Sequence, residues 1–197
     1  LAIGLCKTEF ENDKNDLILF EDFKIKDKFK SKLITLFNTV QIMQGNYGEI
    51  ALSSKQKLKK INRDIRELSD SVNGKYERVF IVDDMCIQEM FCLKLVGSKN
   101  ANAEMFWLED GAVAYFDNCE ISTGMGATKF TRWVRKTYFK SIYRLGKYYD
   151  LGLCMGSHKM LKGVWLTFPN VARWEYNEKK HYLISDRAFK IGMRNLF

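Results

Sequence analysis

Two adjacent carboxylates, Glu109 and Asp110, have the residue types and spacing best suited to chemistry in this chain. They follow the apolar run 105–108 and precede Gly111. Ligands of open α/β sheets bind outside the carboxyl ends of the strands, so a strand that ends here would present both acids to a ligand. Repulsion between the two carboxylates favours a raised pKa for at least one of them, which suits a general base. The alternative is an ordinary turn in which Gly111 bends the backbone and both acids are solvated.

A second acidic pair, Asp83 and Asp84, follows the β-branched run 78–82. Aspartates at a strand end can hold a divalent metal together with a nucleotide phosphate. Adjacent side chains point in different directions, however. We therefore favour a role in capping a helix that begins near Met85, because Asp is a good N-cap residue.

Other catalytic signatures are weak or missing in the sequence. His158 and His181 are surrounded by no catalytic motif, so we interpret both as surface or structural residues. The chain has neither a Walker lysine motif nor a Gly-x-Ser-x-Gly elbow, and Gly124 and Gly126 indicate a flexible loop rather than a dinucleotide site. The five cysteines are scattered, which argues against a disulfide framework or a CxxC metal pair and favours a reducing, cytoplasmic compartment.

The formal net charge of +8 is concentrated in one segment, residues 122–147, which has seven basic residues and no acid. The basic residues are Lys129, Arg132, Arg135, Lys136, Lys140, Arg144 and Lys147. Apolar residues recur in this segment at spacings of three and four, which predicts an amphipathic helix. Its apolar face would carry Phe130, Trp133, Val134, Tyr138, Ile142 and Leu145, with Phe139 and Tyr143 among the basic residues opposite. Such a helix would bind a membrane surface, an anionic polymer or an acidic partner, or it is an ordinary surface helix with a solvated basic face.

The elements that must position these residues alternate along the chain. We predict strands at 16–20, 39–43, 78–82 and 104–108, and weaker ones at 151–154, 164–167 and 181–185. Helices are predicted at 55–71 and 87–96, with the end of a helix at 1–6 and a helical or irregular connection at 28–37. This alternation predicts a single α/β domain over residues 1–197, with a Rossmann-like, mainly parallel sheet and helices on both faces.

Length and composition agree with a folded domain. Of the 197 residues, 46% are hydrophobic, which is enough for a sizeable core. The longest apolar runs fall short of the ~20 residues that a membrane span needs, and no signal peptide is visible, so we expect a cytoplasmic protein that could attach peripherally to the inner membrane face. The sequence opens without Met inside an apolar stretch, from which we expect a piece of a longer protein.

The order of motifs resembles the N-terminal half of bacterial sialyltransferases. The run 79–84, a helix, and then residues 105–111 with Tyr115 shortly after are similar to the polysialyltransferase-like and lipooligosaccharide sialyltransferase families. These families share an acidic-acidic-glycine motif at a strand end, and Glu109-Asp110-Gly111 matches it residue for residue. The stretch 164–169 also resembles the segment that precedes their second domain.

The resemblance implies one half of a GT-B glycosyltransferase, on the acceptor side. Such an enzyme transfers sialic acid from CMP-sialic acid to a cell-surface glycan of a capsule or a lipooligosaccharide. Glu109 or Asp110 would be the general base, with a slight preference for Glu109, and the transfer would need no metal. Residues of the basic segment, from Lys129 to Arg144, would hold an anionic acceptor or the membrane surface. No specific binding of nucleic acid is implied, because charge alone is unspecific.

One feature of the family pattern is missing. The families carry a His-Pro motif that contacts the donor phosphate, but here Lys159 follows His158 and Tyr182 follows His181. Either the chain lacks its C-terminal nucleotide-binding partner domain, or it is a degenerate homologue that has lost donor binding. A different class of function also stands: a non-catalytic α/β binding module that docks on an anionic membrane or polyanion through its basic helix.

Overall fold

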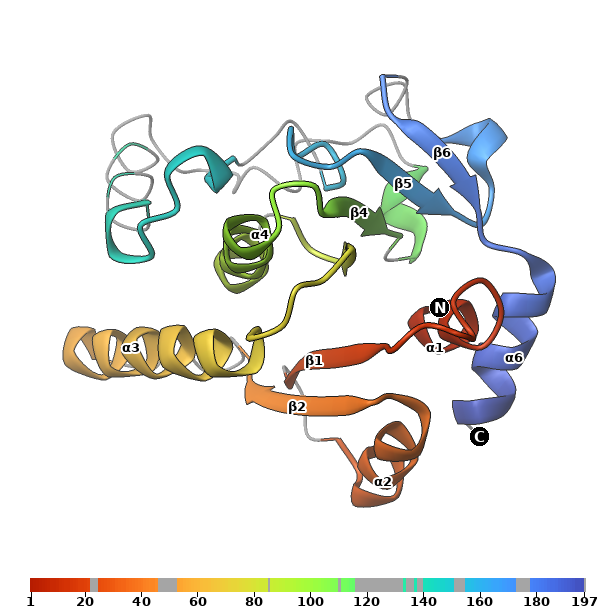
Figure 1. The fold of residues 1–197 in the computed structure, drawn as a ribbon, viewed down its shortest axis with the longest axis horizontal. Helices are drawn as coiled ribbons and strands as arrows, with labels where there is room; N and C mark the ends of the chain where they lie inside the picture. The colour runs from red at the N-terminus through yellow and green to blue at the C-terminus, as the bar shows by residue number, and fades with distance from the viewer. Residues whose placement is uncertain are drawn as a thin grey trace. The chain divides into compact units, whose positions relative to one another are not determined.

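The structure is a computed structural model of residues 1–197, shown as a ribbon in Figure 1. It describes residues 1–21, 25–45, 53–84, 86–109, 111–115, 133, 137, 140–150, 155–172 and 178–196. These residues divide into two compact units. Unit 1 comprises Leu1–Ser71 and Ile184–Phe197, and unit 2 comprises Val72–Leu183. The predicted single α/β domain would contain both.

Unit 1 is built around two parallel strands. Its elements are α1 (Ala2–Cys6), β1 (Asp16–Glu21), α2 (Asp27–Leu36), β2 (Thr39–Gln44), α3 (Ser54–Ser71) and α6 (Asp186–Leu196). β1 and β2 pair in register from Asp16 opposite Thr39 to Glu21 opposite Gln44, and α2 forms the crossover between them. Ile3, Leu33 and Phe37 form a buried cluster, so α1 and α2 share one small core.

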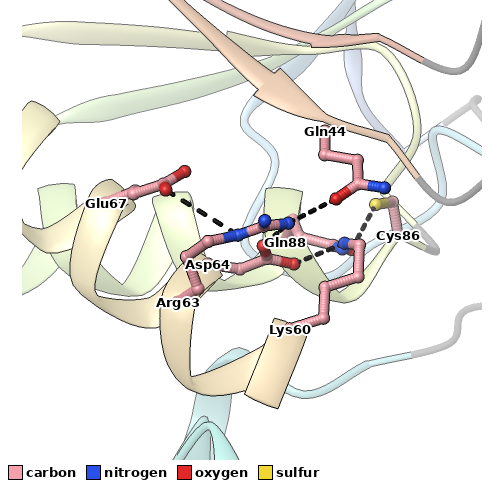
Figure 2. Close-up of polar contacts among 7 residues, drawn as sticks. All are labelled: Gln44, Lys60, Arg63, Asp64, Glu67, Cys86 and Gln88. Atoms are coloured by element: carbon pink, nitrogen blue, oxygen red, sulfur yellow. Dashed lines mark hydrogen bonds and ion pairs between the residues drawn. The ribbon is translucent and has the colours of Figure 1, made fainter. Parts of the chain in front are cut away.

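Polar contacts tie α3 to β2 within unit 1 (Figure 2). Arg63 of α3 donates a hydrogen bond to the side-chain oxygen of Gln44, at 2.5 Å. One turn away, the ammonium of buried Lys60 lies 2.6 Å from the carboxylate of buried Asp64. This ion pair joins residues four apart on one helix face, where opposite charges attract.

Unit 2 carries the larger sheet. Its strands are β3 (Arg78–Ile81), β4 (Glu104–Leu108), β5 (Gly163–Leu166) and β6 (Lys180–Leu183). They lie side by side in chain order, and all neighbouring pairs are parallel. The helix α4 (Ile87–Lys99) connects β3 to β4, and short 3₁₀ helices lie at η2 (Gly111–Ala114), η4 (Gly146–Tyr148) and η5 (Pro169–Val171). The prediction of an α/β fold with parallel strands is confirmed.

The hydrophobic core of unit 2 explains why these segments became strands. Four of the five residues of β4 and all four of β5 are buried, which is typical of central strands in a parallel sheet. Trp107, Val164 and Leu166 pack in one buried cluster with Leu93 of α4. Because the strands are parallel, the residues that follow β3, β4 and β5 all emerge at the same edge of the sheet. The end of β4, with Glu109, therefore lies where the sequence placed it; that this edge faces a cleft stays a prediction.

The predicted elements agree with the structure except in a few places. The two weaker strands at 164–167 and 181–185 are present as β5 and β6, each beginning one residue earlier. The uncertain connection at 28–37 is a helix, α2. The helix α6 was not predicted, and the proposed strand at 151–154 lies outside the described residues.

Candidate functional site

Glu109 is held at the carboxyl end of β4 by the neighbouring strand. Its backbone N–H donates to the carbonyl of Trp165 on β5, at 3.1 Å, so the strand pairing continues to this residue. The side chain is 7% exposed. Its Oε2 accepts a hydrogen bond of 2.8 Å from the backbone N–H of Thr167, the first residue after β5. Glu109 therefore joins the ends of two adjacent strands.

Two hydroxyl groups complete the contacts of this carboxylate. Thr167 donates its hydroxyl to Oε1 of Glu109, and Tyr115 donates its hydroxyl to Oε2. The Tyr115 oxygen in turn accepts a 3.0 Å hydrogen bond from the backbone N–H of Phe168. We call this set of contacts, made by Glu109, Tyr115, Thr167 and the Phe168 backbone, the Glu109 latch.

The raised pKa of Tyr115 preserves its hydrogen bond to Glu109. Burial, followed by the hydrogen bond to Glu109, raises the pKa of Tyr115 to about 12. The phenol therefore stays protonated and able to donate throughout the physiological pH range. The Tyr115 ring also lies edge-on to the Phe168 ring, with centroids 5.9 Å apart.

Gly111 begins the 3₁₀ turn η2 with a φ of +61°. This is the left-handed region, which favours glycine because a Cβ is disfavoured there by the local backbone. A Cβ built at Gly111 would meet no other atom within 4 Å, so the requirement is conformational and not steric. Asp110, the other candidate base, lies outside the described residues, between the anchored Glu109 and this glycine.

Of the second acidic pair, Asp84 does not cap α4, so the prediction is wrong for this residue. The N-cap of α4 is Cys86, which makes no side-chain capping bond. Asp84 is instead buried and accepts two backbone N–H groups from a distant loop, from Gly156 to Oδ1 and from His158 to Oδ2, each at 2.8 Å. Burial raises the pKa of Asp84 to about 6, and the charge of Asp83 adds to the rise while the two backbone bonds oppose it. The Asp84 carboxylate therefore binds a segment distant in the sequence and not the neighbouring helix α4.

Glu89 makes a local contact at the start of α4, with the backbone that precedes the helix. It lies in the first turn of α4, and its Oε2 accepts the backbone N–H groups of Val82 at 2.8 Å and Asp83 at 3.0 Å. Burial raises the pKa of Glu89 to about 8, and the neighbouring charges of Asp83 and Asp84 act in the same direction. An acid in the first turn of a helix is a usual sequence signal, but its partners before the helix were not foreseen.

His158 has the structural role that was predicted for it. It is completely buried, with Nε2 3.0 Å from the carbonyl of Tyr148 and Nδ1 accepting from the N–H of Met160 at 3.1 Å. These partners require a neutral ring with its proton on Nε2, in agreement with a pKa that burial lowers. The other histidine, His181, lies on β6.

The basic segment is described only in part. Lys140 and Arg144 are exposed, as predicted. Lys129, Arg132, Arg135 and Lys136 lie outside the described residues.

Two side chains of the basic segment lie opposite to the prediction. Trp133, assigned to the apolar face, is 61% exposed, and Tyr143, assigned to the basic face, is 3% exposed. The Tyr143 ring packs against Phe91, with centroids 5.6 Å apart. For Tyr143 the reason is that the helix has ended: the next residue, Arg144, has a φ of +48°, so helical spacing no longer decides which side chains are buried there.

The sequence therefore identified part of this site. Glu109 and Gly111 were found through the acidic-acidic-glycine pattern, and Tyr115 was noted with it. Thr167 and the Phe168 backbone were missed as partners, although the predicted strand 164–167 placed them near the same sheet edge. Within the described part of the chain, no three His, Cys, Asp or Glu side chains are gathered in a way that would hold a metal ion.

Comparison of the chain with protein-family models, with curated proteins and with solved structures gave no match in any of the three. Across the described residues, no helix combines the length and the apolar composition needed to cross a membrane.

Proposed function

We propose that this chain is the acceptor-side domain of a sialyltransferase-like glycosyltransferase of GT-B architecture. Its substrate would be a cell-surface glycan, and its donor CMP-sialic acid. The observation that carries the proposal is the position of the acidic-acidic-glycine motif, which directly follows β4 of a parallel sheet. Ligands of such sheets bind at this edge, where a carboxylate can reach an acceptor hydroxyl.

The contacts of Glu109 favour a positioning role for this residue. An ionised carboxylate offers about four acceptor positions, and Glu109 already uses three for Tyr115 and Thr167. At 7% exposure it has little surface left for a substrate. We therefore assign Glu109 to fixing the turn after β4 and shift the proposed base from Glu109 to Asp110.

Asp110 would act as the general base of an inverting displacement. Its carboxylate takes the proton of an acceptor hydroxyl while that oxygen forms a bond to the anomeric carbon of sialic acid. The bond from this carbon to the phosphate oxygen breaks, and CMP leaves with the electron pair. Hydrogen-bonding and cationic groups would stabilise the departing phosphate without a metal. We place the groups that bind CMP in a second domain.

The basic segment 129–144 would hold an anionic acceptor glycan under this proposal. Lys140 and Arg144, its described basic members, are exposed and available to such a ligand. The same exposure, together with that of Trp133, supports the second candidate function, a non-catalytic module that docks on an anionic surface. A substitution at Asp110 separates the two functions, because docking does not depend on a base.

The experiment is a transfer assay on the polypeptide that contains this domain, with CMP-sialic acid and a panel of sialylated and unsialylated oligosaccharides. The glycosyltransferase proposal expects transfer to at least one acceptor, and loss of transfer in Asp110→Asn with an unchanged circular dichroism spectrum. Binding of an acceptor without transfer, unaltered in Asp110→Asn, would favour the non-catalytic module.

A further inference from the structure

We propose that the outer face of α6 docks on an anionic lipid membrane. On a helix with 100° per residue, the exposed side chains of α6 fall into two adjacent rows. One row is apolar, with Phe189 47% exposed and Met193 41% exposed. The other row is basic and exposed, and consists of Arg187, Lys190 and Arg194. We call these five residues the outer face of α6.

The opposite face of α6 is committed to packing within unit 1. Ala188 and Gly192 are buried, and α6 lies against α1. A Cβ on Gly4 of α1 would lie 2.0 Å from the carbonyl oxygen of Ala188, so the two helices approach as closely as backbones can. This close packing fixes the rotation of α6 about its axis. Phe189 and Met193 lie on the side of α6 away from this packing and are exposed.

The combination of side chains identifies the partner as a bilayer. Three basic residues against one acid, Asp186, give the outer surface of α6 a net positive charge. A nucleic acid would attract this charge but offers no apolar region for Phe189 and Met193. At a bilayer surface, apolar side chains enter the boundary between headgroups and acyl chains while neighbouring Lys and Arg side chains stay beside the lipid phosphates. An anionic bilayer therefore accommodates both rows of α6 at once.

This surface is distinct from the basic segment 122–147 and does not depend on the proposed catalytic function. It belongs to unit 1, whereas the basic segment belongs to unit 2. The inference predicts membrane binding whether or not the chain transfers a sugar.

The test is co-sedimentation of the 197-residue chain with vesicles of phosphatidylcholine containing 30% phosphatidylserine, and with vesicles of phosphatidylcholine alone. We expect binding to the anionic vesicles and at least tenfold weaker binding to the neutral ones. A basic residue near such a surface contributes about fivefold in affinity, so Lys190→Glu with Arg194→Glu should weaken binding more than 20-fold. Phe189→Gln with Met193→Gln should weaken it about tenfold. Lys190→Gln with Arg194→Gln provides a milder charge variant if the reversal perturbs folding.

Matched controls come from α3 of the same unit. Lys55→Glu with Lys59→Glu changes the net charge equally, at the same spacing and also at exposed positions. Leu58→Gln removes an apolar side chain that is 45% exposed, close to the value of Phe189. These variants should keep most of the binding. Equal losses in α3 and α6 variants would show attraction by net charge alone and overturn the proposal.

Two other outcomes would also overturn it. One is no binding of the parent chain to the anionic vesicles. The other is binding that survives the α6 substitutions but is lost in Lys140→Glu with Arg144→Glu, which would place the membrane contact in the basic segment. Circular dichroism of each variant shows that the comparison is made between folded proteins.

Discussion

Glu109, which follows β4, accepts both the backbone N–H and the hydroxyl of Thr167, which follows β5. The two residues are separated by 58 positions in the chain. Their contact fixes the end of one strand against the end of the next, at the edge of the sheet where the proposed chemistry takes place.

The Glu109 latch should contribute to stability through Tyr115. Tyr115→Phe removes the hydroxyl, which leaves the Phe168 N–H without this acceptor and Glu109 without one of its donors. We expect the free energy of unfolding in urea to fall by about 1–3 kcal/mol. Tyr182→Phe is the matched control: its ring stacks on Trp165 with centroids 4.9 Å apart, and among the described residues its hydroxyl has no hydrogen-bond partner. Similar losses in both variants would contradict the role given to the Tyr115 hydroxyl.

Gly111 should be sensitive to backbone conformation and not to size. With a φ of +61° and no atom near its absent side chain, Gly111→Ala should lose about 1 kcal/mol of unfolding free energy. Gly111→Asn should lose less, although Asn is larger, because Asn tolerates the left-handed region better. Urea titrations of both variants measure the order. A larger loss of unfolding free energy in Gly111→Asn than in Gly111→Ala would show that side-chain size, and not backbone conformation, limits position 111.

Asp84 should make the protein less stable as the pH rises. Its pKa is about 6 in the folded protein and about 4 when unfolded, so the folded state binds the proton more tightly. The stabilisation by this proton is complete below pH 4 and is lost as the pH rises through 6, a change of about 3 kcal/mol. Asp84→Asn should remove that change between pH 4 and pH 6.5, measured by urea unfolding. Glu89, whose pKa rises from about 4.5 in the unfolded chain to about 8 in the folded protein, remains in the variant and loses its own share of stability from about pH 4.5 to pH 8, so Asp84→Asn should reduce the slope below pH 6.5 and not abolish it. A variant that keeps the parental pH slope below 6.5 would show that Asp84 is not its source.

The packing of α6 against α1 should depend on the absence of a side chain at Gly4. Gly4→Ala places a Cβ 2.0 Å from the Ala188 carbonyl oxygen, so α1 and α6 must separate, and we expect a loss of about 1–3 kcal/mol. Gly192→Ala is the control from the facing helix, because its Cβ would lie 3.4 Å from the nearest atom, an ordinary contact. That substitution should be neutral or stabilising, since Ala favours a helix by about 1 kcal/mol over Gly. Thermal unfolding of both variants tests the close approach, and equal effects would contradict it.

The fold was largely readable from the sequence, most clearly at the central strands β4 and β5, whose residues are almost all buried. The run 104–108 contains four consecutive apolar residues before two acids, a pattern typical of a central strand in a parallel sheet. α6 was missed for a related reason. Its packed face carries the small residues Ala188 and Gly192, and two of its larger apolar residues, Phe189 and Met193, are exposed.

The partners of the site could not be read in the same way. Nothing near Glu109 in the sequence shows that Thr167 will hold it, since that contact depends on the pairing of β4 with β5. Asp84 was assigned to the nearest helix, but burial brought it to the backbone of Gly156 and His158. The sequence therefore identifies these residues as hydrogen-bond acceptors, but their partners depend on the tertiary structure.

The most direct test of the account compares Glu109→Gln with Asp110→Asn in the CMP-sialic acid transfer assay. Gln can keep the Thr167 and Tyr115 contacts through its oxygen and amide, so Glu109→Gln should keep kcat within about tenfold of the parent. Asn cannot accept a proton, so Asp110→Asn should lose 10²- to 10⁴-fold in kcat while staying folded, the usual effect of removing a general base. The opposite pattern, with transfer lost in Glu109→Gln and kept in Asp110→Asn, would contradict both the latch and the proposed base.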